Sequence, residues 1–328
     1  YNYDNSPLSY EHNQLDLIGN WRLGSKSNLR VGYQYDLMYR EYATLSGSEN
    51  SDNQEHTLFA KFKMQPSMAW NLAMYGEVSD RSLNNYDPPP DEHSLMIPFY
   101  VAERQRDQLG LLVEYMPDQA WSFGARAEYN DDSYDEAQLG LIEAETPSFT
   151  LDATYHPSKD VTTYAYYTRE QVKSKQYGSA TTVGSDPTNP WQEDFDDAMD
   201  TFGLGSKVAG LGKWDIGLDL TYNKSKGKID MTDFGSTTTT SAYPDLKTEL
   251  ASLKLWAQYH QGKNLVYRLS YWYEDYDADD WALDGLEPAS LIDRPSPGPS
   301  NTNYLLTGED TLDYQVNVFG VSVVYLFP

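Results

Sequence analysis

Apolar and polar residues alternate along most of this chain. Between residues 29 and 40 every second position is apolar or aromatic, and most positions between them are polar or charged. Successive side chains of a β-strand point to opposite faces, so this pattern predicts a strand with one apolar and one polar face. The pattern recurs in about thirteen segments, at residues 15–23, 29–40, 57–64, 70–78, 109–115, 121–129, 149–155, 161–170, 201–209, 214–222, 253–259, 265–273 and 312–327.

The predicted strands are long, at roughly ten residues each, whereas the average strand has about five or six. A tilted strand that crosses a bilayer needs about nine to eleven residues. The connections alternate between short turns and long loops, which is typical of outer-membrane barrels. The short turns are 24–28, 65–68, 117–119, 157–160, 210–213 and 261–264, and the long loops are about 44–53, 83–105, 131–147, 171–198, 225–247 and 275–311.

These features predict an all-β fold, a transmembrane antiparallel up-and-down β-barrel with residues 1–328 as a single domain. The expected location is the bacterial outer membrane, with the long loops extracellular and the short turns periplasmic. Trp70, Trp121 and Trp214 each follow a short turn, where a periplasmic aromatic girdle is expected. A soluble β-sandwich also has alternating strands. Strand length and the alternation of loop lengths favour the membrane barrel.

The end of the chain carries a further barrel feature. Phe319, Val321, Val323, Tyr325 and Phe327 share one face, a pattern typical of the assembly signal of bacterial outer-membrane barrels. Apolar residues just before them, 314–318, have the opposite phase, which predicts a bulge near residue 318. Complete single-chain bacterial barrels normally have an even number of strands. The odd count therefore leads us to expect that N-terminal strands of a larger barrel precede this chain.

Composition narrows the possible functions. The chain has no cysteine, which excludes disulfides, thiolate metal sites and CxxCH haem attachment on this chain. The net charge of −26 argues against nucleic acid as a partner, because phosphates would be repelled. Aromatic residues make up 14% of the chain, which does not fit a disordered protein.

Several stretches resemble the MtrB/PioB family of decahaem-associated outer-membrane barrels. The matching pieces are "YNYDNSPLSYEHNQLDLIGNWRL", "LRVGYQYDLMYRE" and "QEHTLFAKFKMQPSMAWNLAMYGEVSDRS" near the start, and "DWALDG" and "GEDTLDYQVNVFGVSVVY" near the end. The resemblance implies a barrel of roughly 26 strands, of which this chain would be the C-terminal half. It also implies that the barrel sheathes a periplasmic multihaem cytochrome, that a second such cytochrome can dock outside the cell, and that the haem is carried by the partner.

We predict that the polar strand faces line a lumen and contact the partner. The candidates for this contact are Arg22, Arg30, Gln34, Asp36, Arg126, Asp152, Lys254 and Arg268. Outer-membrane lipid is the other expected partner.

The acidic stretch "EDYDADD" offers a weak candidate calcium site at Asp275, Asp277, Asp279 and Asp280. It departs from a calcium loop, because Asp280 stands where the sharp-turn glycine is needed and Leu286 where a bidentate glutamate is needed. A solvated acidic loop is the alternative. The five histidines are scattered, and no nucleophile or base accompanies paired carboxylates such as Asp131 and Asp132. We therefore expect no catalytic, cofactor-binding or firm metal-binding residues, and no enzyme activity.

Two functions follow from these observations. The first is a barrel that sheathes and positions a multihaem cytochrome so that electrons cross the outer membrane. The second is a general diffusion porin for small solutes. A polar lumen of mixed charge is compatible with both. The acidic long loops, at 131–147 and 275–311, are expected to form a negative rim outside the cell.

Overall fold

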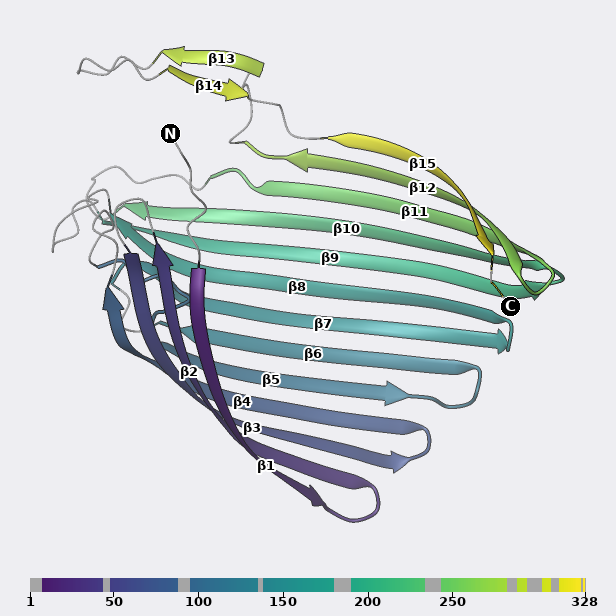
Figure 1. Cartoon of the computed structure of the whole chain (residues 1–328), viewed down its shortest axis with the longest axis horizontal. Helices are drawn as coiled ribbons and strands as arrows, with labels where there is room; N and C mark the ends of the chain where they lie inside the picture. Colours follow the sequence, from purple (N-terminus) through teal and green to yellow (C-terminus); the bar gives the residue numbers. More distant parts are fainter. Residues whose placement is uncertain are drawn as a thin grey trace. The chain divides into compact units, whose positions relative to one another are not determined.

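The computed structural model of the chain describes residues 8–43, 48–87, 95–134, 138–179, 190–233, 243–281, 288–293, 303–307, 313–325 and 327. These residues form strands, turns and irregular segments (Figure 1). No helix among them is long and apolar enough to cross a membrane. The strands are β1 (Leu8–Arg22), β2 (Ser27–Ala43), β3 (Ser48–Ser67), β4 (Trp70–Asp87), β5 (Arg104–Tyr115), β6 (Trp121–Ser133), β7 (Gly140–Ser158), β8 (Val161–Ser179), β9 (Pro190–Leu211), β10 (Trp214–Asp233), β11 (Leu246–Gln261), β12 (Leu265–Asp279), β13 (Pro288–Asp293), β14 (Asn303–Thr307) and β15 (Tyr314–Tyr325).

Thirteen strands form one sheet in sequence order, β1 to β12 followed by β15, and β13 pairs with β14 in a separate hairpin. The registered pairs are antiparallel, as expected for an up-and-down meander. The predicted strand count is therefore confirmed for this sheet. Its contacts divide the chain into two compact units, which are described in turn. The first unit is Tyr1–Asp152, Arg169–Asp197 and Ile229–Tyr243, and the second is Ala153–Thr168, Ala198–Lys228 and Pro244–Pro328.

The strands are longer than the predicted ten residues, and this is a correction to the sequence analysis. Strands of the main sheet range from 12 residues in β5 to 22 in β9. β8 continues to Ser179 and β9 begins at Pro190, so much of the loop expected at 171–198 is strand. Beyond the bilayer both faces of a strand are polar, so backbone pairing continues after the hydrophobic alternation has ended.

In the first unit, register sorts the side chains into two faces. One row of the apolar face is Leu17, Tyr33, Leu58 and Val78, paired in succession from β1 to β4. The side chain of Leu17 is 60% exposed and that of Leu58 is 55% exposed. The next row belongs to the polar face and runs Asp16, Gln34, Thr57 and Ser79. Rows of aliphatic side chains left open across several strands are the surface that lipid requires.

The height of the apolar face matches a membrane. On β4 it extends from Trp70 to Val78, and the next residue of that face is Asp80. The eight residue-to-residue steps between them cover roughly 27 Å of strand at about 3.4 Å per residue. A tilt of about 40° reduces this to a height of roughly 21 Å, close to the apolar band of about 25 Å in outer-membrane barrels. The rings of Trp70 and Tyr115 stack at its lower edge, with centroids 4.3 Å apart.

The buried core of the described residues lies at the long-loop end of the first unit. Segment 95–103, between β4 and β5, folds back onto the polar face. Val101 is fully buried, and Ala102, Tyr134 and Leu139 are at most 5% exposed. The backbone of Leu139 donates to the carbonyl oxygen of Leu95 at 3.3 Å, which ties the segment to the start of β7. The amides of Val101 and Ala102 both donate to the carbonyl oxygen of Pro98 at 3.0 Å, so the segment is a compact turn.

In the second unit, the last strand corrects another prediction. Pairing of β12 with β15 runs without a shift from Leu265↔Tyr325 to Tyr276↔Tyr314, so there is no bulge near Val318. Val316 and Val318 instead lie on the polar face, opposite Glu274 and Trp272. In the sequence, the apolar residues move from one set of alternate positions to the other before Phe319. In the structure this shift places apolar side chains on the polar face, and the register does not change.

Short turns join the strands at the opposite end from segment 95–103. In the turn between β9 and β10, Gly210 and Gly212 have φ values of 69° and 67°, which favour glycine. The Asp215 carboxylate accepts a hydrogen bond from the Gly210 amide at 2.7 Å and lies 2.9 Å from the His260 ring. In the turn between β5 and β6, Asp118 accepts from the amides of Ala120 and Trp121 at 2.8 and 2.9 Å. Aspartates therefore cap two of these turns.

Candidate functional site: the polar face of the sheet

The polar face of the first unit is strongly basic near the short turns. Arg22 and Lys63 flank Asn28 in one row, and Arg30 and Lys61 are paired in the next. Arg126, on β6, stands opposite Leu112 on the same face. All of these side chains are exposed. Among the described residues none of them has an ion-pair partner. We call Arg22, Arg30, Lys61, Lys63 and Arg126 the basic patch.

A hollow in the wall adjoins this basic patch. It has a volume of about 650 Å³ and is lined by Asn20, Arg22, Lys26, Asn28, Lys63, Asn71 and Glu114 among others. Asn71 donates to Glu114 at 3.2 Å. Lys26 donates to the carbonyl oxygen of Pro66 in the neighbouring turn. The polar part of the lining is thus made of cations, amides and serines, with a single carboxylate that is already engaged, and Met64, Leu72, Ala73 and Leu112 form the apolar part.

At the long-loop end, an ionic cluster holds segment 95–103 in place. Arg104 lies 2.5 Å from Glu55, and Ser79 donates to the same carboxylate oxygen at 2.8 Å. Arg81 donates to the carbonyl oxygens of Ala102 and Phe99 at 2.8 and 2.6 Å. Arg104 therefore binds the carboxylate directly, whereas Arg81, the register partner of Glu55, anchors the backbone of the folded segment.

The charged groups of this cluster lie beyond the row of Leu58 and Val78, towards the long loops and outside the apolar band. They shift one another's pKa values. Burial acts to raise the pKa of the Glu55 carboxyl, but the charge of Arg104 and hydrogen bonds from Arg104 and Ser79 hold that pKa below its ordinary value. Burial and the like charge of Arg104 lower the pKa of the Arg81 guanidinium to about 10. Glu55 is therefore ionised, and it is the group that makes this arginine pair tolerable.

The sequence analysis did not identify this cluster or segment 95–103. A signal was present, because "LMIPFYVA" at 95–102 is an apolar run inside a stretch expected to be a polar loop. Glu55, Arg81 and Arg104 occupy equivalent heights on three strands, which only the register reveals.

In the second unit, cations of the polar face stack on tryptophans. Lys254 lies 5.0 Å from the centre of the Trp272 ring, and Arg268 lies 5.4 Å from that of Trp256. Trp256 also covers Gly217, whose missing side chain leaves room for the ring. The guanidinium and ammonium groups here have aromatic neighbours, whereas in the basic patch only Arg30 lies over a ring, that of Phe59.

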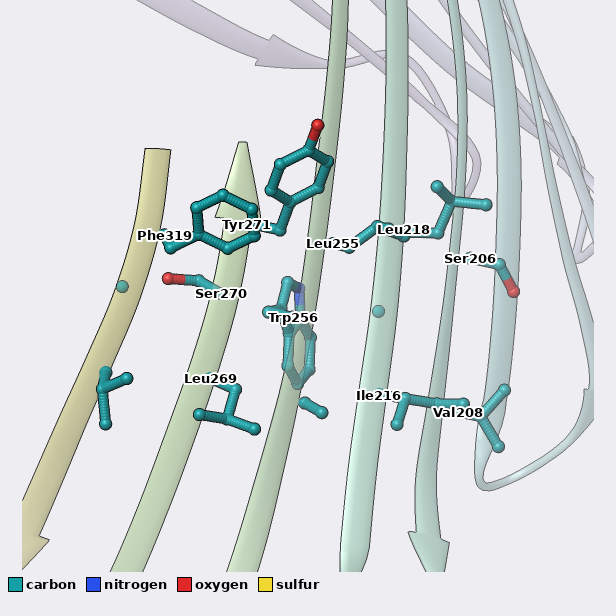
Figure 2. Close-up of a pocket in the computed structure, with 14 residues that line it drawn as sticks. Ser206, Val208, Ile216, Leu218, Leu255, Trp256, Leu269, Ser270, Tyr271 and Phe319 are labelled. Atoms are coloured by element: carbon teal, nitrogen blue, oxygen red, sulfur yellow. The ribbon is translucent and has the colours of Figure 1, made fainter. Parts of the chain in front are cut away.

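The apolar face of the second unit has a shallow groove of about 500 Å³. Figure 2 shows Leu218, Leu255, Tyr271 and Phe319 along it, which form one row across β10, β11, β12 and β15. Its polar atoms are few, and it lies on the same face as the other exposed aliphatic side chains. This groove is therefore a surface for hydrocarbon rather than a site for chemistry.

The register places all the predicted contact residues on the polar face. In the first unit, Arg22, Arg30, Gln34 and Asp36 alternate with the apolar row, Arg126 belongs to the basic patch, and Asp152 lies against Gly124. Asp36 lies 2.7 Å from the ring of His12. Lys254 and Arg268 have the same phase on β11 and β12. Whether these residues touch a partner stays a prediction.

The acidic stretch at 275–280 is not a loop, because β12 runs through Asp279. Alternate residues of a strand are roughly 7 Å apart, so the carboxylates of Asp275, Asp277 and Asp279 form a line and not a cage. Asp279 instead pairs with Lys247 at 3.1 Å. Asp280 follows the strand. Among the described residues no group of three or more acidic, histidine or cysteine side chains is arranged to hold a metal ion.

Comparison with known proteins decides the family. The family described as "Putative outer membrane beta-barrel porin, MtrB/PioB" matches residues 1–327. The chain belongs to the MtrB/PioB family. The resemblance predicted from the sequence is thereby confirmed, and with it the all-β barrel fold and the outer-membrane location. In an MtrB/PioB barrel the apolar face meets lipid and the polar face lines the lumen.

Comparison of this MtrB/PioB protein with individual proteins shows how much of each chain is similar. Outer membrane protein MtrB of Shewanella baltica (strain OS185) is 24% identical over 286 residues, which are 85% of this chain and 39% of that protein. The chain thus spans about two fifths of the length of this relative. The siderophore receptor PiuA of Acinetobacter baumannii aligns with 82% of the chain and 48% of its own, at 11% identity and a TM-score of 0.48. The outer membrane transporter YddB of Escherichia coli aligns with 81% and 47%, at 11% identity and a TM-score of 0.41.

Proposed function

We propose that this chain forms part of the wall of an outer-membrane barrel that encloses a multihaem c-type cytochrome, so that electrons cross the membrane. The family shows a porin-like barrel of the outer membrane, and the cytochrome is the further step that we infer from the family resemblance. The observation that carries the step is the polar face, whose unpaired cations need a partner. A second multihaem cytochrome outside the cell would extend the path.

The chain's own chemistry supports a structural role. Covalent attachment of c-type haem needs cysteine, and this chain has none, so the haem belongs to the partner. The barrel would contribute in two ways. Its apolar face holds the assembly in the bilayer, and its closed polar wall keeps lipid away from the partner. We propose neither a cofactor nor a catalytic residue on this chain.

A diffusion porin for small solutes is the second candidate. Segment 95–103, folded onto the polar face and clamped by Arg81, is the observation that favours it, because a solute pore needs a fixed segment to limit its width. The two functions differ in what the lumen holds. A porin lumen holds water, whereas a sheath holds a folded protein.

Reconstitution separates the two functions. The full-length protein, purified from outer membranes with whatever it retains, is placed in liposomes that contain a redox dye. A sheath is expected to pass electrons to the enclosed dye only when a haem protein is bound, as seen on a haem-stained gel, and to exclude small sugars. Free sugar entry without a co-purified haem protein would contradict the proposal.

A further inference from the structure

The basic patch is unusual for a chain of this charge. The protein carries 50 acidic and 24 basic residues, a net charge of −26. The long-loop segments 131–147 and 275–310 are acidic, yet Arg22, Arg30, Lys61, Lys63 and Arg126 gather within a few rows of the polar face. Among the described residues of this unit, Glu114, Glu128 and Asp152 are the acidic residues of the same face near this height, and Glu114 already accepts from Asn71.

Structural roles for these cations are largely absent. Among the described residues, none of the five forms an ion pair, and only Arg30 stacks on a ring, 5.7 Å from the centre of Phe59. Exposed like charges on adjacent strands repel one another, as Arg30 and Lys61 do in their direct pair. Such an arrangement destabilises the free sheet and is relieved when anionic groups lie across it.

We infer that the basic patch, with the hollow beside it, is the docking surface for an acidic face of the protein that the barrel encloses. The inference rests on the proposed function, because it needs a protein in the lumen. Charge complementarity identifies the partner surface as one rich in aspartate and glutamate carboxylates. The amides of Asn20, Asn28 and Asn71 line the same hollow and supply neutral hydrogen bonds between the cations.

The position of the basic patch gives it a role in orientation. It lies next to the short turns, with Arg22 at the end of β1 and Lys63 four residues before the end of β3. If those turns are periplasmic, the patch stands at the mouth through which a periplasmic protein enters. An acidic surface is repelled by the rest of this chain and attracted here, so the patch selects which end of the partner is held at the mouth.

The first experiment locates the partner. A photo-crosslinking residue is placed at Asn71, in the hollow, and in a separate variant at Thr221, on the polar face of the second unit. Both are made in the full-length protein in cells. We expect a haem-stained cross-linked band from Asn71. A band from Thr221 without one from Asn71 would overturn this inference and leave the proposed function standing. No haem-stained band from either position would contradict the proposed function itself.

The second experiment tests the charge. The triple variant Arg22→Gln, Lys63→Gln, Arg126→Gln is compared with the double variant Lys207→Gln, Lys213→Gln, which changes two exposed lysines of the second unit that are not among the predicted contact residues. We expect the triple variant to lower the Asn71 cross-link severalfold at low salt, and the difference to shrink near 1 M salt, where the Debye length is about 3 Å. The double variant is expected to retain the Asn71 cross-link. An undiminished cross-link in the triple variant, with normal heat-modifiable barrel migration, would overturn the electrostatic basis.

Discussion

At the scale of single residues, the face and the depth of a strand position decide which substitutions the barrel tolerates there. Leu218 is in the middle of the apolar band, in the row with Leu255 and Tyr271. Tyr33 is towards the long-loop end of the apolar face of its unit, where the next row changes from Leu15 and Tyr35 to His56 and Asp80, and its hydroxyl lies 2.7 Å from the His56 ring. Leu218 is therefore in the middle of the apolar face of its own unit, whereas Tyr33 is nearer the edge of the apolar face of the other unit.

We predict that Leu218→Arg blocks stable insertion and that Tyr33→Asp does so less strongly. A charge at the bilayer midplane costs about 2–4 kcal/mol, and the cost falls towards the interface and is lower for acids. The neighbouring polar-face changes Gln34→Asn and Asp219→Asn should be tolerated. Heat-modifiable gel migration measures all four variants. Equal tolerance at both sets of positions would show that the faces are assigned wrongly.

A pH-dependent prediction concerns Glu55. Its pKa is lowered in the folded protein, so its contribution to stability is present above the ordinary glutamate pKa of about 4.3 and is lost as the pH falls through the lower folded value. Segment 95–103 should therefore loosen on strong acidification. The Glu55→Gln variant should be loose already at neutral pH, because it leaves Arg81 and Arg104 without their shared counter-charge.

A spin label measures this loosening. Phe99 is 57% exposed and the chain has no cysteine, so Phe99→Cys provides a unique labelling position on this chain. The label should be restricted at neutral pH and mobile in acid, and mobile at both in the Glu55→Gln background. Glu128→Gln, which removes an exposed acid of the same face, is the control. Unchanged mobility in the Glu55→Gln protein would contradict the role assigned to the cluster.

At the scale of elements, the sequence predicts strands well wherever one side meets lipid. The row of Leu17, Tyr33, Leu58 and Val78 alternates with polar residues, and the predicted strands there are confirmed. Prediction ends where the alternation ends. The upper part of β3, "SENSDNQE" at 48–55, has no apolar residue to mark a face, yet its backbone pairs on both sides. Backbone hydrogen bonds leave no trace in composition.

The candidate site was predictable to a similar degree. Strand phase alone places Arg22, Arg30 and Arg126 on the polar face. It does not show that these side chains lie close together or that they lack ion-pair partners. Both facts depend on the register of each pair of strands from β1 to β6, and the sequence pattern does not fix that register. At Val316 and Val318 the sequence predicted an irregularity that the structure does not have. The apolar residues there suggested a bulge, but the pairing of β12 with β15 is regular. A polar face can carry apolar side chains, so a change of phase is weak support for a bulge.

We predict that the backbone amides of residues 171–179 and 191–198 exchange slowly with solvent. These residues were expected to be loop, but they belong to β8 and β9 in the described structure. Amides paired in a sheet are protected, whereas those of an open loop exchange without opening. Hydrogen–deuterium exchange with mass spectrometry on the detergent-solubilised protein measures this, with the short turn at 117–119 as the fast-exchanging control. Rapid exchange throughout 171–179 would mean that the strand ends at the membrane.

At the scale of the whole molecule, charge is distributed unevenly along the strands. In the first unit the basic patch lies beside the short turns, and in the second unit the stretch 275–310, which begins in the last residues of β12, carries nine acidic residues and one base. If the acidic end docks an outer cytochrome, replacing Asp275, Asp277, Asp279 and Asp280 with asparagine should weaken that docking. The loss should be largest at low salt, where charges are least screened. Binding of the outer partner to intact cells is the measurement, and an unchanged salt dependence would leave solubility as the role of these acids.

The roles proposed for the basic patch and for the acidic stretch 275–310 both assume one orientation of the chain in the membrane. This orientation can be tested directly. Long-loop segments outside the cell are within reach of added protease, and periplasmic turns are not. We predict that proteinase K added to intact cells cuts within residues 275–311 and spares the turn at Pro117, and that Pro117 becomes accessible once the outer membrane is permeabilised. Antibodies against tags in the two segments identify the fragments. Cleavage at Pro117 in intact cells, with 275–311 protected, would reverse the topology. The basic patch would then face the outside, and the acidic end would meet the periplasm.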